Sequence, residues 1–187
     1  FAAMQRLIDR MGGIVWVDSD LGKGSCFGFR VELPVAEAGG VPLAQIDGDQ
    51  ITTRRTVAAS ALAASYLARA DARHLLVVGA GAVAALLPEA YRTVRPIDRV
   101  TVWARRADEA PAHPARWRQD VLAARATTEL PAASAQADVV SCATLATEPV
   151  VRGAWLAPGS HLDLIGSFTP AMREADDVCF EDARVFV

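Results

Sequence analysis

Apolar runs of strand length alternate with longer segments of helical spacing from residue 41 onward. Four of these runs have the texture of parallel strands that are buried on both faces, which are apolar almost throughout. They are residues 74–78, 99–103, 138–144 and 161–166, and residues 184–187 begin a further one. Strands that alternate with helices predict an α/β fold, here a doubly wound parallel sheet of Rossmann type.

Four helices are expected around these strands. The first covers residues 52–69, is rich in alanine, and should be capped near Asp49 or Thr52. The residues expected on its buried side are Val57, Ala61, Leu62 and Leu67. The other helices are expected at residues 82–94, 107–125 and 128–137.

Residues 1–34 carry a different pattern. Apolar residues from Met4 to Met11 are spaced as on one face of a short helix, and two strands are expected at residues 14–18 and 26–33. The Gly22-Lys23-Gly24-Ser25 segment between the strands favours a hairpin turn, because a phosphate-binding loop has four residues between its glycines and leads into a helix. Residues 35–42, with several Gly and Pro, are interpreted as a linker, and residues 43–187 as the Rossmann domain.

Composition narrows the class of protein. With 52% apolar residues, a net charge of -3 and a pI near 5.6, the chain is typical of a globular protein and gives no electrostatic reason to expect nucleic acid or an anionic membrane as partner. The three cysteines have neither zinc-site nor CxxC spacing, so no metal site is expected. The longest apolar stretch, residues 75–90, is interrupted by glycine and proline and is too short to span a bilayer, so a cytoplasmic protein is expected.

The most informative motif is Gly79-Ala80-Gly81-Ala82-Val83-Ala84, which follows an expected strand and opens an expected helix. In a dinucleotide-binding loop the first glycine permits the tight turn and the second lets a pyrophosphate approach the backbone. A small third residue lets the helix pack closely, and the helix N-terminus faces the phosphates. The context favours cofactor binding, with a purely structural turn as the alternative.

The residues after the second Rossmann strand bear on the choice of nicotinamide cofactor. A carboxylate at that position binds the ribose hydroxyls of NAD, whereas arginine accommodates the 2′-phosphate of NADP. Here Arg105 and Arg106 follow the strand, and no carboxylate stands at its end. NADP(H) is therefore favoured, NAD(H) stays open, and the alternative is that both arginines are solvated surface charges.

Loops after the carboxyl ends of parallel strands line the ligand crevice of such sheets. This places Ala143, Thr144, Gly166, Ser167, Phe168 and Thr169 near the nicotinamide. The complete set of expected cofactor-binding residues is Thr56, Gly79, Gly81, Ala82, Val83, Arg105, Arg106, Ala143, Thr144, Ile165 and Gly166.

Several motifs occur in an order that resembles the ornithine cyclodeaminase/mu-crystallin family over about residues 41–187. They are Ile46-Asp47-Gly48-Asp49, Thr53-Arg54-Arg55-Thr56, Val78-Gly79-Ala80-Gly81, Ser141-Cys142-Ala143-Thr144, Glu148-Pro149-Val150 and Trp155-Leu156-Ala157-Pro158-Gly159. The string from His161 to Pro170, followed by Met172-Arg173-Glu174, looks most like the imine reductases of the family, which act on 1-pyrroline-2-carboxylate or 1-piperideine-2-carboxylate.

The resemblance implies roles for individual residues. Arg55 would grip the substrate carboxylate, a task that suits the planar fork of a guanidinium, and Ser167 and Phe168 would lie at the substrate. Phe168 stands where ornithine cyclodeaminases carry a catalytic aspartate, which favours hydride transfer to a cyclic imine over deamination. Thr169, or a bound water, would supply the imine proton, although Thr169 equally suits a turn cap.

The resemblance also implies a cyclic imino acid as the small-molecule partner and a homodimer for the intact family. Residues 1–34 instead resemble the last part of a sensor histidine kinase ATP-binding domain, without the family's ATP-binding boxes. An incomplete family domain is therefore expected, and its activity is an open question. The alternatives to an imine reductase are a non-catalytic, NADPH-binding mu-crystallin-like protein, an ornithine cyclodeaminase and a kinase fragment.

Overall fold

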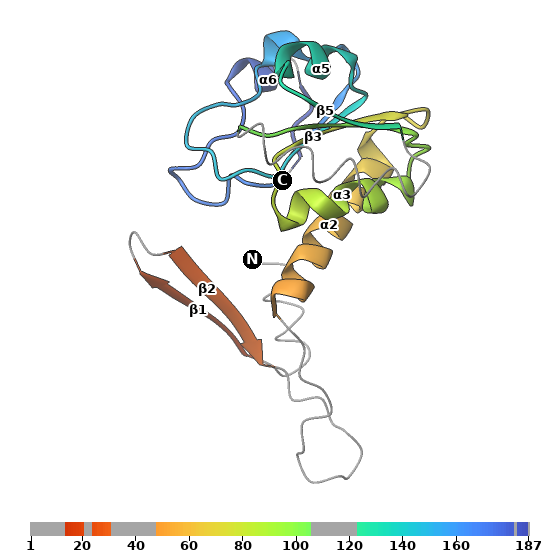
Figure 1. Ribbon diagram of the computed structural model, residues 1–187. Coiled ribbons are helices and arrows are strands. Elements are labelled where there is room, and N and C mark those ends of the chain that lie inside the picture. Colours follow the sequence, from red (N-terminus) through yellow and green to blue (C-terminus); the bar gives the residue numbers. More distant parts are fainter. Residues whose placement is uncertain (1–13, 21–23, 31–47, 106–122, 182, 187) are drawn as a thin grey trace. The chain divides into compact units, whose positions relative to one another are not determined.

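The computed structural model describes residues 14–20, 24–30, 48–105, 123–181 and 183–186 (Figure 1). The chain divides into two compact units, residues 1–45 and 46–187. In the first unit, β1 (Ile14–Asp20) and β2 (Gly24–Arg30) form an antiparallel pair, with Ile14 opposite Arg30 and Asp20 opposite Gly24. The two expected strands are confirmed with shifted ends. The expected helix of residues 4–11 and the linker of residues 35–42 lie outside the described residues.

The second unit is built on a parallel sheet of five strands in the order β5-β4-β3-β6-β7 (Figure 1). The strands are β3 (His74–Val78), β4 (Arg99–Trp103), β5 (Ala123–Thr127), β6 (Val139–Cys142) and β7 (His161–Leu164). Central β3 is apolar after its first residue and fully buried, as a parallel strand covered on both faces must be. The predicted α/β fold with a parallel sheet is confirmed.

Helices cover the two faces of this sheet (Figure 1). On one face, α2 (Gly48–Leu67) and α3 (Ala82–Arg92) pack with alternate residues of β3 and β4, Leu75 and Val100 among them. On the other face, α5 (Leu130–Gln136), the short 3-10 helix η2 (Gly153–Trp155) and α6 (Val178–Glu181) pack with Leu76 and Val140. Successive strand residues thus serve two apolar cores.

Two expectations near the ends of the sheet were wrong. Residues 107–125 were expected to contain a helix and no strand, yet residues 123–127 form β5 and pair in parallel with β4, with Ala123 opposite Arg99. Residues 107–122 lie outside the described part of the chain. The strand expected to begin at Arg184 is absent from residues 184–186, and the preceding helix α6 was not expected.

The first helix also differs from expectation. It begins at Gly48, so Thr52, expected as a cap, lies inside the helix. Leu62 and Leu67, expected to be buried, are 59% and 38% exposed. Val57 and Ala61 are buried, as expected, and Ser60 and Ala64 are buried with them, because small side chains let α2 and α3 approach closely.

The remaining elements match expectation within two or three residues at their ends. The helices expected at 82–94 and 128–137 correspond to α3 and α5. The strands expected at 138–144 and 161–166 correspond to β6 and β7, which are shorter. Pro88 is accommodated inside α3, where it is buried.

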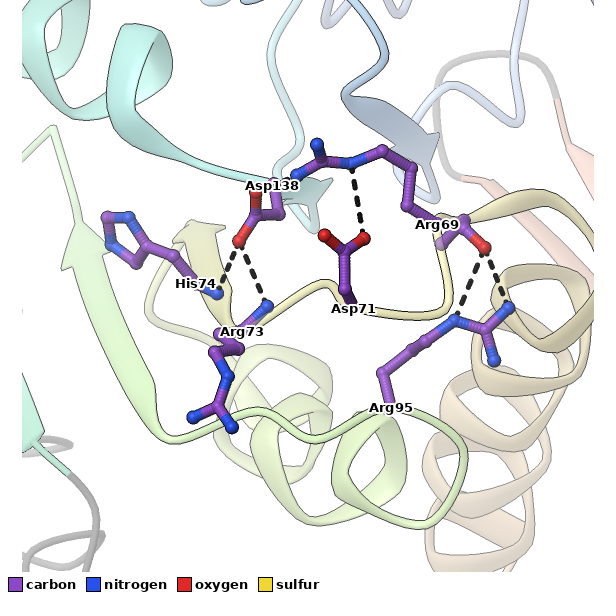
Figure 2. Close-up of polar contacts among 7 residues, drawn as sticks. Arg69, Asp71, Arg73, His74, Arg95 and Asp138 are labelled. Atoms are coloured by element: carbon purple, nitrogen blue, oxygen red, sulfur yellow. Dashed lines mark hydrogen bonds and ion pairs between the residues drawn. The ribbon is translucent and has the colours of Figure 1, made fainter.

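A carboxylate at the amino-terminal edge of the sheet holds the entry to β3 (Figure 2). Asp138 Oδ2 accepts the backbone N–H groups of Arg73 and His74, both at 2.9 Å, and Oδ1 accepts from the Arg69 guanidinium. Arg95 caps the end of α2, because its guanidinium donates to the carbonyl oxygen of Ala68 at 2.7 Å. These contacts fix how α2, β3 and β6 meet.

Candidate functional site

The candidate site lies at the carboxyl ends of the three strands β3, β6 and β7. The residue that follows each strand continues the parallel ladder. Gly79 N–H donates to the Trp103 carbonyl at 2.8 Å, Ala143 N–H to the Val78 carbonyl at 2.8 Å, and Ile165 N–H to the Cys142 carbonyl at 2.9 Å. The structure thus brings together five of the expected cofactor-binding residues, which are Gly79, Ala143, Thr144, Ile165 and Gly166.

Gly79 stands where no other residue fits. Its φ of 126° is in the range that favours glycine. A Cβ at this position would lie 2.4 Å from the Ala143 carbonyl oxygen, a contact with backbone that cannot move away cheaply. The first glycine of the motif therefore lets β3 turn while the loop after β6 lies directly against it.

Gly81 has a different environment. It is the N-cap of α3, with an ordinary φ of -80°, and a Cβ there would meet nothing within 4 Å. The direction in which a Cβ of residue 81 would point is open space, and no side chain caps the N-terminus of α3. The amide groups of the first turn, which have no partner within a helix, are left for a ligand. Ala82 is exposed beside Gly81, whereas Val83 is partly buried against the core. This cradle fits a dinucleotide pyrophosphate.

The two loops after β6 and β7 are held by one buried carboxylate. Glu174 Oε1 accepts from the backbone N–H and from the hydroxyl of Thr144, both at 2.7 Å, and Oε2 accepts from the Gly166 N–H at 2.7 Å. Glu174 is only 1% exposed. Burial raises the pKa of this carboxyl above its usual 4.5, against the opposing effect of the hydrogen bonds.

Three residues expected at the substrate, Ser167, Phe168 and Thr169, lie in the loop after β7. Ser167 is exposed, and its Oγ accepts the Glu174 backbone N–H at 3.2 Å. Phe168 is 70% exposed. Thr169 is partly buried, and its carbonyl oxygen accepts the Met172 N–H at 3.0 Å, so its backbone belongs to a turn.

The two α2 residues of the prediction are not joined to this cluster by any recorded contact in the described ranges. Arg55 is exposed. The Thr56 hydroxyl donates to the Thr52 carbonyl at 2.7 Å, inside α2. Arg105 is exposed two residues beyond the end of β4, and Arg106 lies outside the described residues.

Two other polar side chains near the sheet, Asp163 and Cys142, have structural roles. Asp163 Oδ2 accepts from Tyr91 at 2.9 Å and from Ser141 at 2.7 Å, which makes it a satisfied strand carboxylate. Burial raises the pKa of the Cys142 thiol well above its usual value, so this side chain is a packing residue and a poor nucleophile. The described ranges contain no group of three or more His, Cys, Asp or Glu side chains placed to hold a metal ion.

Sequence reasoning did not identify Glu174 as part of the site. The residue appeared only inside a longer family string, and a single glutamate in a loop carries no periodic signal. Its role depends on Thr144, which is 30 positions away in the chain. Only the fold shows that pairing.

Three kinds of comparison place the chain among known proteins. Its sequence is 49% identical to the Delta(1)-pyrroline-2-carboxylate reductase of Paracoccus denitrificans over 151 residues, which are 76% of this chain and 45% of that protein. The structure of the Thermococcus litoralis Delta(1)-pyrroline-2-carboxylate reductase, with NADH and L-proline, superposes with a TM-score of 0.72 at 30% identity, over 82% of this chain and 47% of that one. An archaeal alanine dehydrogenase dimer with bound NAD superposes with a TM-score of 0.71 at 30% identity, over 88% and 52% of the two chains.

The chain therefore spans about half the length of the relatives it matches. Among the described residues, no helix is both long and apolar enough to cross a membrane. The family model for ornithine cyclodeaminase/mu-crystallin proteins matches residues 31–187, so it lends no support to the kinase resemblance of residues 1–34. With most of its length matched by that model, and with the glycine loop at the end of β3, this chain belongs to the ornithine cyclodeaminase/mu-crystallin family.

Proposed function

We propose that this chain forms the dinucleotide-binding part of an NAD(P)H-dependent reductase that converts 1-pyrroline-2-carboxylate or 1-piperideine-2-carboxylate into L-proline or L-pipecolate. The observation that carries the proposal is the open cradle at Gly81, at the N-terminus of α3, in a chain 49% identical to a Delta(1)-pyrroline-2-carboxylate reductase. Open space beside the second glycine is what the approach of a pyrophosphate to the backbone requires.

Different residues along the carboxyl edge of the sheet contact the two halves of the cofactor. The α3 amides and Gly81 hold the pyrophosphate, while Ala143, Thr144, Ile165 and Gly166 border the nicotinamide. When bound there, a reduced nicotinamide would supply the hydride for the imine carbon, and the imine nitrogen of the substrate would take up a proton.

At the substrate, Arg55 binds the carboxylate, and Thr169 or a water delivers the proton. The exposed Phe168 brings no carboxylate, which supports reduction over the deamination of an ornithine cyclodeaminase.

The cofactor preference rests on the end of β4. Trp103 and Ala104 are followed by the exposed Arg105, and no carboxylate stands there to bind a ribose 2′-hydroxyl. We therefore propose that both nicotinamide dinucleotides bind and that NADP(H) binds more tightly.

The surroundings of the protein are also part of the proposal. We expect a cytoplasmic protein, since a reducing compartment suits the unpaired Cys142 and Cys179. We expect a homodimer, because Leu62 and Tyr66 on α2 are 59% and 81% exposed and would be covered by a second subunit or domain. Nucleic acid and membranes are not among the expected partners.

The direct test is a fluorescence titration of the chain with NADPH and with NADH, followed by addition of 1-pyrroline-2-carboxylate. Loss of NADPH absorbance with formation of proline supports a reductase, and Arg55→Ala should then raise KM much more than it lowers kcat. Arg92→Ala is the matched control, because it removes an exposed arginine from a different helix, α3. Binding without oxidation identifies a non-catalytic NADPH-binding protein, and absence of binding by either nucleotide contradicts the cofactor site itself.

A further inference from the structure

We infer that Glu174 is a positioning residue for the nicotinamide half of the site: its carboxylate fixes the loop after β6 and the loop after β7 at one distance from each other. The inference rests on the proposed dinucleotide site, and it goes beyond that site by assigning a positioning role to a buried side chain outside the glycine loop.

The geometry is that of a two-sided clamp. Oε1 takes two donors from Thr144, on the loop after β6, and Oε2 takes the backbone N–H of Gly166, on the loop after β7, all at 2.7 Å. Each oxygen is thus committed to a different loop. Because an ionised carboxylate accepts at both oxygens, glutamate satisfies all three donors at once.

The two loops lie against each other closely enough for the clamp to matter. A Cβ on Gly166 would lie 1.9 Å from the Thr144 carbonyl oxygen and 2.5 Å from Glu174 Oε1. Glycine is therefore required at 166 by the contact between the loops, and the carboxylate fills the remaining space. A shift of a few tenths of an ångström in one loop is passed to the other.

The backbone of Glu174 is anchored as firmly as its side chain. Its carbonyl oxygen accepts the N–H groups of Val150 and Val151, both at 2.9 Å, and its N–H donates to Ser167 Oγ at 3.2 Å. The carboxylate consequently approaches the loops from a backbone position that is fixed against Val150 and Val151.

The position of the clamp decides which half of a dinucleotide depends on it. The pyrophosphate cradle, Gly79 to Ala82, is the turn between β3 and α3, and in the described ranges the donors to the Glu174 carboxylate belong to Thr144 and Gly166. Thr144, Gly166 and Ser167 belong to the opposite side of the switch point, where the nicotinamide is expected. Loss of the clamp should weaken binding of the whole cofactor and spare its adenosine diphosphate ribose half.

The test is Glu174→Gln in the complete chain. Glutamine keeps the length and shape, but its amide nitrogen is a donor and would face either Gly166 N–H or the Thr144 donors, which leaves at least one of them unpaired. Glu148→Gln is the matched control, because it makes the same chemical change at an exposed position in the loop after β6.

Two readouts are compared for both variants. In hydrogen exchange, the amides of Thr144 and Gly166 should exchange at least tenfold faster in Glu174→Gln, with the α3 amides unchanged. In titrations, the Kd for NADPH should rise about tenfold and the Kd for ADP-ribose should stay within twofold of the wild-type value.

The outcomes separate the clamp from the proposed function. Unchanged exchange at Thr144 and Gly166, or equal weakening of NADPH and ADP-ribose, overturns the positioning role. Failure of the wild-type chain to bind NADPH overturns the proposed function and the nicotinamide role with it, while the exchange data still decide whether the carboxylate holds the loops.

Discussion

The Nε2 atom of His74 lies 2.8 Å from the Thr101 hydroxyl, and neither side chain is exposed to solvent. The Nδ1 atom lies 2.8 Å from the Gln136 carbonyl, which can only accept, so Nδ1 carries a proton. In the neutral imidazole Nε2 accepts from the Thr101 hydroxyl. Burial lowers the pKa of His74 below its usual 6.5, and the nearby charges of Arg99 and Arg125 lower it further.

We expect the free energy of unfolding to decrease as the pH falls below about 6.5, the pKa of an unfolded histidine. Below that pH the unfolded chain binds a proton that the folded chain does not, so protonation favours unfolding. Each unit of pKa difference corresponds to about 1.4 kcal/mol. Urea unfolding between about pH 8 and pH 5 measures the effect.

Variants separate the two histidines that contribute to this dependence. Burial also lowers the pKa of His161, so His161→Gln should remove one part of the pH dependence and His74→Gln the other. A His74→Gln protein whose stability follows pH as steeply as the wild type would contradict the assignment to His74.

Removal of the Asp138 carboxylate should destabilise the fold. Asp138→Ala leaves the backbone N–H groups of Arg73 and His74 without their acceptor and breaks the ion pair with Arg69 (Figure 2). We expect a loss of about 1–3 kcal/mol in the free energy of unfolding, measured by urea titration. Asp71→Ala is the control, because the Asp71 side chain is 79% exposed and its ion pair with Arg69 is long, at 3.8 Å. Its removal should lower the free energy of unfolding by less than about 1 kcal/mol.

Substitution by alanine should lower stability at one glycine of the loop and leave it nearly unchanged at the other. Gly79→Ala places a methyl group 2.4 Å from the Ala143 carbonyl at a φ of 126°, so it should lower the free energy of unfolding by about 1–3 kcal/mol. Gly81→Ala meets no atom within 4 Å and should change stability by less than about 0.5 kcal/mol.

The same pair tests the cofactor site. The Gly81→Ala methyl group would occupy the space assigned to the pyrophosphate, so the Kd for NADPH should rise at least tenfold in a protein that is as stable as the wild type. Fluorescence titration and thermal unfolding of the same sample measure both quantities. Unaltered NADPH binding by Gly81→Ala would contradict the placement of the pyrophosphate.

Arg105 should govern the choice between the two nicotinamide dinucleotides. If its guanidinium pairs with a 2′-phosphate, Arg105→Ala should raise the Kd for NADPH about tenfold, which is about 1.4 kcal/mol. The Kd for NADH, which has no 2′-phosphate, should stay within twofold. Parallel titrations with both dinucleotides measure the ratio, and equal effects on the two would assign Arg105 to general electrostatics.

The order of the central elements could be predicted because their signals are local. The apolar run from Leu75 to Val78, the glycines that follow and the helix after them occupy one continuous stretch, so pattern and spacing suffice. β5 could not be predicted in the same way. Ala123–Thr127 consists largely of helix-favouring residues, and its strand conformation comes from pairing with β4.

Burial was predicted least well where side-chain size decides packing. A helical pattern suggests that Leu62 and Leu67 face the core, yet α2 packs through Ser60, Ala61 and Ala64. The larger side chains remain outside because the closest approach of two helices is set by the smallest residues between them.

By itself the sequence determined the family, the parallel sheet and the glycine loop at the end of β3, since the motifs, the apolar runs and the glycines that indicate them are each short continuous segments. Only the tertiary structure decided which side chains share the site. Glu174 meets Thr144 across 30 positions and Gly166 across 8, because the parallel register brings the ends of β6 and β7 together. Contacts of that kind depend on strand order and register, which are properties of the assembled sheet and not of any one segment.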